Sequence, residues 1–276
     1  MITGKTIPAG TNWVQSNKTN GSAYSLHIIS TGRIIMGSTG IWYSDDNGVN
    51  WVKSNKTNGF TYSLCITPTG RIIAGGSEGI WYSDDNGVNW VQSNKTYGSW
   101  KALCVTPTGR IIAGSDDNIS DGIWYSDDNG VNWTPSNNKP ASSCNSLYVT
   151  STERIIAASS AGIWYSDDNG VNWIKFNGTL GNYETVYVTS SGIITVGYYY
   201  SNDNGTTWTK ATGVTSCNSI CATPTGRLIA GSSTKGIWYS DIENQSKYSS
   251  KPLTGKQAKE LVRQCKAYVQ ELKNRS

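Results

Sequence analysis

Short apolar stretches separated by turn residues recur along the whole of this chain. The pattern is clearest at YSLCITP (62–68), RIIAGG (71–76), GIWYS (79–83) and NWVQS (89–93). Each stretch is rich in β-branched and aromatic residues, and Gly, Asn or Pro lies in the turns between them. The alternation within each stretch suits strands that pack on neighbours at both faces. We therefore predict four strands in this unit.

The same unit returns six times. Its third strand reads IWYS at 41–44, 80–83, 123–126, 163–166 and 237–240, and YYYS at 198–201. A tryptophan follows the next turn at positions 13, 51, 90, 133, 173 and 208, at intervals of 35 to 43 residues. Repeats of this length built from four strands are typical of propeller blades. The sequence predicts an all-β, six-bladed β-propeller of four-stranded blades.

The two ends of the repeated region complement each other. The last IWYS is followed by DIENQ without a tryptophan, whereas Trp13 has a fourth strand after it but no IWYS before it. We expect the N-terminal strand to complete the last blade, with residues 217–241 giving its other three strands. Such closure leaves no blade edge open to aggregation. Residues 1–250 form the propeller domain in this interpretation.

The segment 251–276 has a different character. Thr254 to Gln257 reads as a capping box, and Ala258, Leu261, Val262, Cys265, Val269 and Leu272 fall on one helical stripe. We predict a basic amphipathic helix from about 255 to 274. It could pack on the propeller, dock on another chain or lie on a membrane surface.

Charge and composition narrow the function. Residues 251–276 hold seven Lys/Arg and two Glu, so the tail is +5 and the remainder, with sixteen basic and seventeen acidic residues, is −1. A neutral body offers no face to a phosphate backbone, so we expect no nucleic-acid partner. No apolar run reaches the length of a membrane span, so we expect no transmembrane segment. No signal-peptide pattern opens the chain, so we expect no secretory signal. The compartment is not determined, although synthesis in the cytoplasm and assembly into a phage particle would suit this composition.

The six cysteines do not read as a disulfide framework. Cys65, Cys104 and Cys221 share one repeat position, and Cys144 and Cys217 share another. Equivalent positions in a radial repeat are held apart, so pairing would be awkward. We expect reduced, buried thiols.

The turn before each tryptophan resembles the Asp-box, or bacterial neuraminidase repeat, SxDxGxTW. SNDNGTTW (201–208) matches it fully, and four copies of SDDNGVNW carry Asn in place of Thr. The resemblance implies a sialidase-like architecture in which the boxes are structural and lie at the turn between the third and fourth strands, away from the ligand face. The structural box residues are Ser44, Asp46, Gly48, Trp51, Ser83, Asp85, Gly87, Trp90, Ser126, Asp128, Gly130, Trp133, Ser166, Asp168, Gly170, Trp173, Ser201, Asp203, Gly205 and Trp208.

Sialidase chemistry is not expected to accompany this architecture. It needs three arginines that converge on a carboxylate, but Arg33, Arg71, Arg110, Arg154 and Arg227 occupy one repeat position, on the side of the Asp-boxes. They read as structural residues that hold neighbouring turns. No carboxylate pair has an obvious spacing for glycoside hydrolysis. His27 occupies a wall position in strand one, so we assign no catalytic residue and no enzyme activity.

A ligand, if one binds, is expected on the opposite face, where the repeats differ. The candidate ligand-binding residues lie just before each first strand, and they are Tyr24, Tyr62, Trp100, Lys101, Asn145, Tyr183, Glu184 and Asn218. Aromatic rings and amides suit sugars, although these rings could instead pad the blade junctions.

Three functions stay open. We predict a non-catalytic recognition module, most simply for glycans, in a phage particle or at a cell surface. The alternative is an intracellular scaffold that docks a protein through its ring face or C-terminal helix, and a divergent sialidase-like glycosidase comes third. We assign no cofactor and no metal. Asp116, Asp117 and Asp121 could hold Ca²⁺, but their spacing matches no recognised metal loop, so a solvated acidic loop is the preferred interpretation.

Overall fold

The protein is an arc of antiparallel β-sheets, described here from a computed structural model. The structure describes residues 14–17, 21–56, 58–116, 122–179, 181–189, 192–211, 217, 219–222, 227–232 and 236–240. Trp13 and the predicted helix within 251–276 lie outside the described residues. Within the described residues we find no helix with the length and apolar character that crossing a bilayer requires.

Six sheets follow one another along the chain, and each is a meander of consecutive strands. The first sheet comprises β1 (Ser25–Ile28), β2 (Ile34–Ser38), β3 (Gly40–Ser44) and β4 (Val52–Lys53). The second comprises β5 (Thr61–Ile66), β6 (Ile72–Gly76), β7 (Gly79–Ser83) and β8 (Val91–Gln92). The third comprises β9 (Trp100–Val105), β10 (Ile111–Ser115), β11 (Ile123–Ser126) and β12 (Thr134–Pro135).

The second half of the chain repeats this order. The fourth sheet comprises β13 (Cys144–Val149), β14 (Ile155–Ser159), β15 (Gly162–Ser166) and β16 (Ile174–Lys175). The fifth comprises β17 (Val186–Val188), β18 (Ile194–Val196), β19 (Tyr199–Ser201) and β20 (Thr209–Lys210). The sixth comprises β21 (Ser219–Ala222), β22 (Leu228–Ser232) and β23 (Gly236–Tyr239), without a fourth strand in the described residues.

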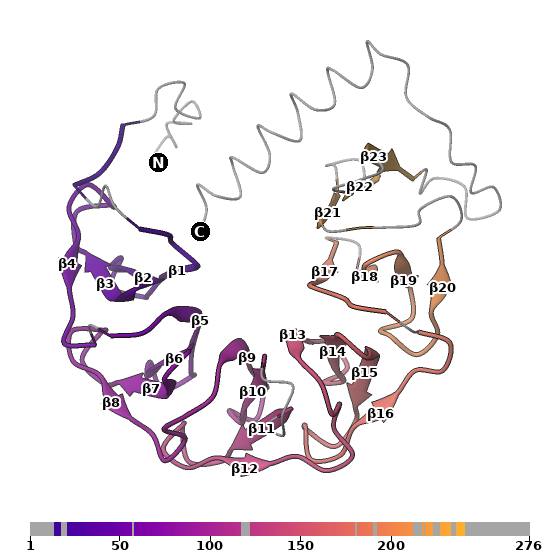
Figure 1. Ribbon diagram of the computed structural model, residues 1–276, viewed down its shortest axis with the longest axis horizontal. Helices are drawn as coiled ribbons and strands as arrows, with labels where there is room; N and C mark the ends of the chain where they lie inside the picture. The colour runs from indigo at the N-terminus through magenta and orange to yellow at the C-terminus, as the bar shows by residue number, and fades with distance from the viewer. Residues whose placement is uncertain are drawn as a thin grey trace, which may run out of the picture.

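Figure 1 shows the first strand of each sheet on the inside of the arc and the short fourth strands on the outside. The prediction of an all-β propeller built from four-stranded blades is confirmed. The first and sixth sheets lie at the two ends of the arc, and residues 14–17 lie beside the first sheet (Figure 1). Closure of the last blade by the N-terminal strand stays a prediction, because Trp13 is not among the described residues.

Residues 14–17 nevertheless make the contacts of an outer strand. The Asn17 side-chain oxygen accepts the backbone N–H of Trp51 at 2.8 Å, and the Asn17 N–H donates to the Val49 carbonyl at 3.2 Å. One blade further on, Asn55 binds Trp90 and Val88 in the same way, and Asn94 binds Trp133 and Val131 in the blade after that. The residue after each of these outer strands therefore ties it to the Asp-box of the next blade.

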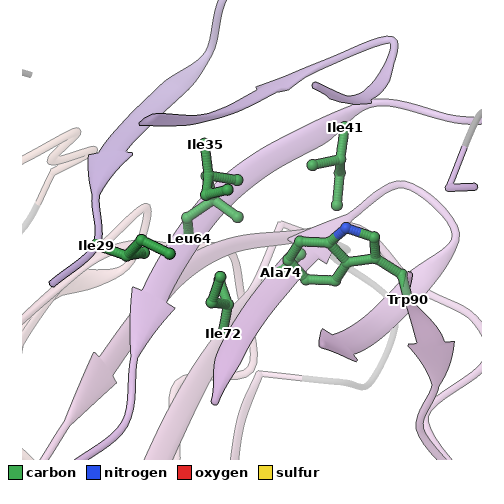
Figure 2. Packing of buried hydrophobic residues seen from close by; sticks show 7 residues of the cluster. All are labelled: Ile29, Ile35, Ile41, Leu64, Ile72, Ala74 and Trp90. Carbon is green, nitrogen blue, oxygen red and sulfur yellow. The ribbon is translucent and has the colours of Figure 1, made fainter. Parts of the chain in front are cut away.

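The core lies between neighbouring sheets. Figure 2 shows one such cluster, in which Ile35 and Ile41 of the first sheet pack against Leu64, Ile72 and Trp90 of the second. Equivalent clusters join the second sheet to the third and the third to the fourth. Both faces of a middle strand such as β6 are buried, so its apolar residues run consecutively instead of alternating. Burial between blades fixes the order of the sheets.

Each Asp-box closes the turn between the third and fourth strands. In the first box, Ser44 Oγ donates to Asp46 Oδ1 at 2.9 Å and accepts the Gly48 N–H, also at 2.9 Å. Asp46 also accepts the backbone N–H of Asn50 at 2.8 Å. Asn47 and Gly48 both have positive φ, of 59° and 85°, which is why this turn requires Asn-Gly. The box is thus a hydrogen-bonded corner.

Arginines join neighbouring boxes, as the repeat position predicts. Arg71 donates to both oxygens of Asp84, at 2.6 and 2.8 Å, and Nη1 donates to the Asn129 carbonyl of the next box at 3.0 Å. Its guanidinium lies 4.3 Å from the centre of the Tyr82 ring. Arg33, Arg110 and Arg154 make the same bidentate pair and the same bridge to the next box. These four arginines therefore have a structural role.

Candidate functional site

The candidate site lies where the inner strands begin, at the end opposite the Asp-boxes. A cavity of about 700 Å³ opens there between the first four sheets. Leucines at one repeat position form its wall, and they are Leu26, Leu64, Leu103 and Leu147. Tyr24, Ser63, Lys101 and Asn145 stand among the residues that line it. The cavity is thus lined by both apolar and polar groups, with Tyr24, Lys101 and Asn145 at the edge where the inner strands begin.

A β-bulge aims one residue from each of three inner strands at this edge. In β5, β9 and β13, the ladder skips Tyr62, Lys101 and Asn145 respectively. A bulged residue leaves the ladder unpaired and its strand bends, which redirects the side chain. By register Tyr24 takes the equivalent place in the first sheet, since Ser25 pairs with Gly37 as Ser63 pairs with Gly75.

Three aromatic rings gather on one side of this edge. The centre of the Tyr24 ring lies 5.4 Å from that of Tyr62 and 5.9 Å from that of Phe60, edge to face in both cases. The rings of Phe60 and Tyr62 are stacked, with their centres 6.1 Å apart. Tyr24 is 46% exposed and Phe60 is 43% exposed. These rings come from two neighbouring sheets, so the group exists only once the blades have packed. We call Tyr24, Phe60 and Tyr62 the aromatic rim.

Polar groups occupy the other side. Lys101 Nζ forms an ion pair with Asp116 Oδ2 at 2.7 Å. Asn145 Nδ2 donates to the Tyr183 carbonyl at 2.9 Å and to Asn182 Oδ1 at 3.3 Å. The exposed Glu184 accepts a hydrogen bond from Asn182 Nδ2 at 2.8 Å. These donors and acceptors thus lie at the same end of the inner strands as the aromatic rim.

Two of the predicted ligand residues are not at the surface. Trp100 is fully buried and its indole donates to the Tyr97 carbonyl at 3.0 Å. Tyr183 is 2% exposed and packs against Tyr198 and Tyr199. The prediction that these two rings contact a ligand is therefore corrected. For Trp100 the physical reason is the bulge, because the residue before the bulged Lys101 pairs with Ser115 in the ladder and enters the core. For Tyr183 it is the packing of its ring against two other tyrosines.

The remaining predicted residues divide as follows. Tyr24, Lys101 and Asn145 line the cavity, Tyr62 belongs to the aromatic rim, and Glu184 lies beside Asn182. Asn218 lies outside the described residues, as do Asp117 and Asp121 of the acidic loop. Sequence reasoning missed Phe60 and the pairing of Asp116 with Lys101. Phe60 directly precedes β5 and lies two residues before the predicted Tyr62, and that nearness was the available signal.

Burial shifts the pKa values of one histidine and three cysteines of the inner strands. His27 lines the cavity from β1, and burial lowers its pKa below the usual range, which opposes a role as a charged group. The thiols of Cys65 and Cys144 are buried and their pKa values are raised, while burial raises the pKa of Cys104 to about 12. Cys65, Cys104 and Cys144 are free thiols. A thiol with so high a pKa is a poor nucleophile or metal ligand.

In the part of the chain that the structure describes, no three His, Cys, Asp or Glu side chains are grouped to hold a metal ion. A second cavity, of about 450 Å³, opens at the opposite ends of the inner strands, and Pro68 and Pro107 line it. It lies at the turns that carry the arginine bridges, and its described lining is apolar or hydroxyl-bearing.

Comparison with known proteins agrees with the repeats. A family model described as BNR/Asp-box repeat matches residues 124–135 and 199–210. No curated protein sequence matches the chain.

Solved structures share the fold at low identity. An ancestral GH74 enzyme superposes with a TM-score of 0.67 at 17% identity, over 90% of this chain and 41% of that one. The extracellular domain of a putative one-component system from B. thetaiotaomicron superposes with a TM-score of 0.61 at 14% identity, over 86% of this chain and 34% of that one. Virginiamycin B lyase from Staphylococcus aureus superposes with a TM-score of 0.60 at 12% identity, over 87% of each chain. This chain therefore spans less than half the length of the first two.

These likenesses show the architecture and leave activity open, because unrelated functions share one propeller fold. With its repeated boxes, its sheets in propeller order and its structural neighbours, the chain is a β-propeller that carries BNR/Asp-box repeats.

Proposed function

We propose that this protein is a non-catalytic recognition propeller that binds glycans at the mouth of the cavity. The observation that carries the proposal is the aromatic rim, whose three rings touch one another and stay partly exposed. The apolar face of a sugar packs on such rings. Exposed aromatic groups in mutual contact at a concave site are typical of binding surfaces.

The polar side of the mouth completes the recognition of a sugar. Asn145 and Lys101 line the cavity and Asp116 pairs with Lys101, so together they offer donors and acceptors for sugar hydroxyls. Their own contacts fix them in place, so little side-chain entropy is lost on binding.

Catalysis is not part of the proposal. Glycoside hydrolysis uses two carboxyl groups in defined positions across the scissile bond. At the described rim Asp116 is held by Lys101, and Glu184 accepts from Asn182. The arginines that could grip a sialic acid are bonded to Asp45, Asp84, Asp127 and Asp167 at the opposite face.

A protein ligand is the second candidate. Aromatic residues clustered in a partly exposed patch also form the centres of protein interfaces. The aromatic rim would then accept a partner's side chain in place of a sugar. Docking through the C-terminal segment, and the origin in a phage particle or at a cell surface, stay predictions.

A glycan array followed by titration of the best ligand tests the proposal. We expect Tyr24→Ala and Tyr62→Ala each to weaken binding about 3- to 10-fold, the value of one aromatic contact. Val91→Ala is the matched control, because this exposed apolar residue lies on the outer strand β8 and should bind as the wild type does.

Two results would count against the proposal. Absence of binding to any sugar, with a protein partner captured through the same tyrosines, would establish the second candidate. Hydrolysis of a fluorogenic glycoside that is abolished by Glu184→Gln or Asp116→Asn would show an enzyme.

A further inference from the structure

We infer that the mouth of the cavity selects neutral sugars and rejects acidic ones, and that Asp116 sets this selectivity. The inference rests on the proposed function and names the ligand class of the same site. It follows from the charges at the rim and from where the arginines lie.

The lysine at the rim is neutralised. Lys101 is the cation among the described residues that line the cavity, and its ammonium lies 2.7 Å from Asp116 Oδ2. Both side chains are partly exposed, at 39% and 30%, so the pair is reachable by a ligand. A sugar carboxylate that approached Lys101 would have to compete with Asp116 and would be repelled by it.

The backbone holds Asp116 in this position. Its N–H donates to the Ser99 carbonyl at 2.7 Å, and its own carbonyl accepts Ser143 Oγ at 3.0 Å. Ser99 precedes β9 and Ser143 precedes β13, so the aspartate is anchored to two neighbouring blades. Lys101 is directed toward it by the bulge in β9. The ion pair is therefore a built feature of the rim.

The next blade adds negative charge. By register Glu184 takes the place that Lys101 takes in the third sheet, and it is exposed. Asp116 and Glu184 against Lys101 leave the described polar side of the mouth with one negative charge in excess. An acidic sugar would thus lose hydration and meet like charge.

Strong carboxylate recognition in proteins relies on the two-pronged guanidinium group. The arginines Arg33, Arg71, Arg110 and Arg154 all lie at the Asp-box end, each bonded to two oxygens of one aspartate. None of these four can reach the mouth. A neutral sugar needs no such group, because its ring packs on the aromatic rim and its hydroxyls bind Asn145 and the ion pair.

The test compares one neutral disaccharide with the same disaccharide carrying a sialic acid. We expect the wild type to bind the neutral form at least about tenfold tighter. We expect Asp116→Asn to reduce that ratio about 3- to 5-fold, since an exposed ion pair contributes up to about 1 kcal/mol. The preference should also weaken as salt is raised.

Asp84→Asn is the matched control. Asp84 pairs with Arg71 at the opposite end, so its loss should leave the ratio unchanged. Lys101→Gln gives a second measurement with Asp116 left unneutralised, and we expect it to raise the preference for the neutral form. Far-ultraviolet circular dichroism confirms that each variant is folded.

The outcomes separate the two proposals. A wild type that binds the sialylated form as tightly or more tightly overturns the inference and leaves glycan binding standing. An unchanged ratio in Asp116→Asn overturns the role of Asp116. A folded wild type that binds neither form, nor any sugar on the array, overturns the proposed function together with the inference.

Discussion

At the residue scale, the Asp-box shows how asparagine replaces threonine. In the fifth box Thr207 Oγ1 donates to Asp203 Oδ2 at 2.6 Å, and its N–H donates to Asp203 Oδ1 at 2.9 Å. In the second box Asn89 Nδ2 and N–H donate to the same two oxygens of Asp85, at 2.7 and 2.8 Å. The two residues are thus equivalent donors, which is why SDDNGVNW works as an Asp-box.

These bonds make the box carboxylates acidic. Burial by itself would raise the pKa of Asp203, but hydrogen bonds from Thr207, Ser201 and Thr206 outweigh it and lower the pKa to about 2. The pKa values of Asp46, Asp85, Asp128 and Asp168 are also lowered. An aspartate in the unfolded chain titrates near pH 4, so folding favours the charged form.

We therefore predict an acid transition. The stabilisation from Asp203 is fully present above about pH 4 and is lost as pH falls through about 2, because the folded pKa lies below the unfolded one. Urea midpoints measured from pH 5 to pH 2 should fall over this range. Asp203→Asn should show a shallower fall than the wild type. A midpoint that stays constant down to pH 2 would contradict the assignment.

At the element scale, the second to fifth box turns each pack on a strand of the preceding blade. A Cβ built on Gly130 would lie 2.6 Å from Ile73 Cδ1 of β6, and one on Gly170 would lie 2.5 Å from Ile112 Cδ1 of β10. Glycine is needed there both for positive φ and for space. The turns therefore contribute to blade packing as well as to chain reversal.

Two glycines separate the effect of positive φ from the effect of crowding. Gly130 and Gly109 have φ of +87° and +86°, but a Cβ at Gly109 meets nothing within 4 Å. We expect Gly109→Ala to cost about 1 kcal/mol from backbone strain alone. Gly130→Ala should cost about 1 to 3 kcal/mol more, because it crowds the buried Ile73. Denaturant unfolding measures both, and equal losses would show that the box turn is not packed as described.

At the scale of the whole molecule, the first four blades are held by similar contacts at each junction. Arginine bridges, outer-strand asparagines and clusters of isoleucine and tryptophan recur from one blade to the next. Repeated junctions of this kind would close the arc into a ring if the sixth sheet gained a fourth strand. Among the described residues the sixth sheet ends at β23, and the contacts of Asn17 are those made next to an outer strand.

A cross-link tests this closure. In the second sheet Tyr82 pairs with Val91, and the equivalent residues at the ends of the chain are Tyr239 and Val14. We expect Val14→Cys with Tyr239→Cys to form a disulfide under mild oxidation, identified by peptide mass spectrometry. Val52→Cys with Tyr239→Cys is the control, because Val52 already pairs with Tyr43. A double variant at 14 and 239 that stays reduced would refute closure by this strand.

The sequence by itself determined the blades. A repeated third strand, an Asn-Gly turn and a tryptophan at constant intervals are local signals, and they predicted the sheets, the box turns and the end of the molecule at which the arginines lie. Local patterns suffice for these features because strand alternation and turn conformation depend on neighbours in the chain.

Only the tertiary structure decided the candidate site. The bulges assign Lys101 to the surface and Trp100 to the core, although the two are adjacent in sequence. Contacts across segments far apart in the chain bring Tyr24 to Tyr62 and Lys101 to Asp116. A period-two pattern fixes which face a side chain takes in a regular strand, but one extra residue shifts that register, and the packing of whole blades selects which side chains then meet.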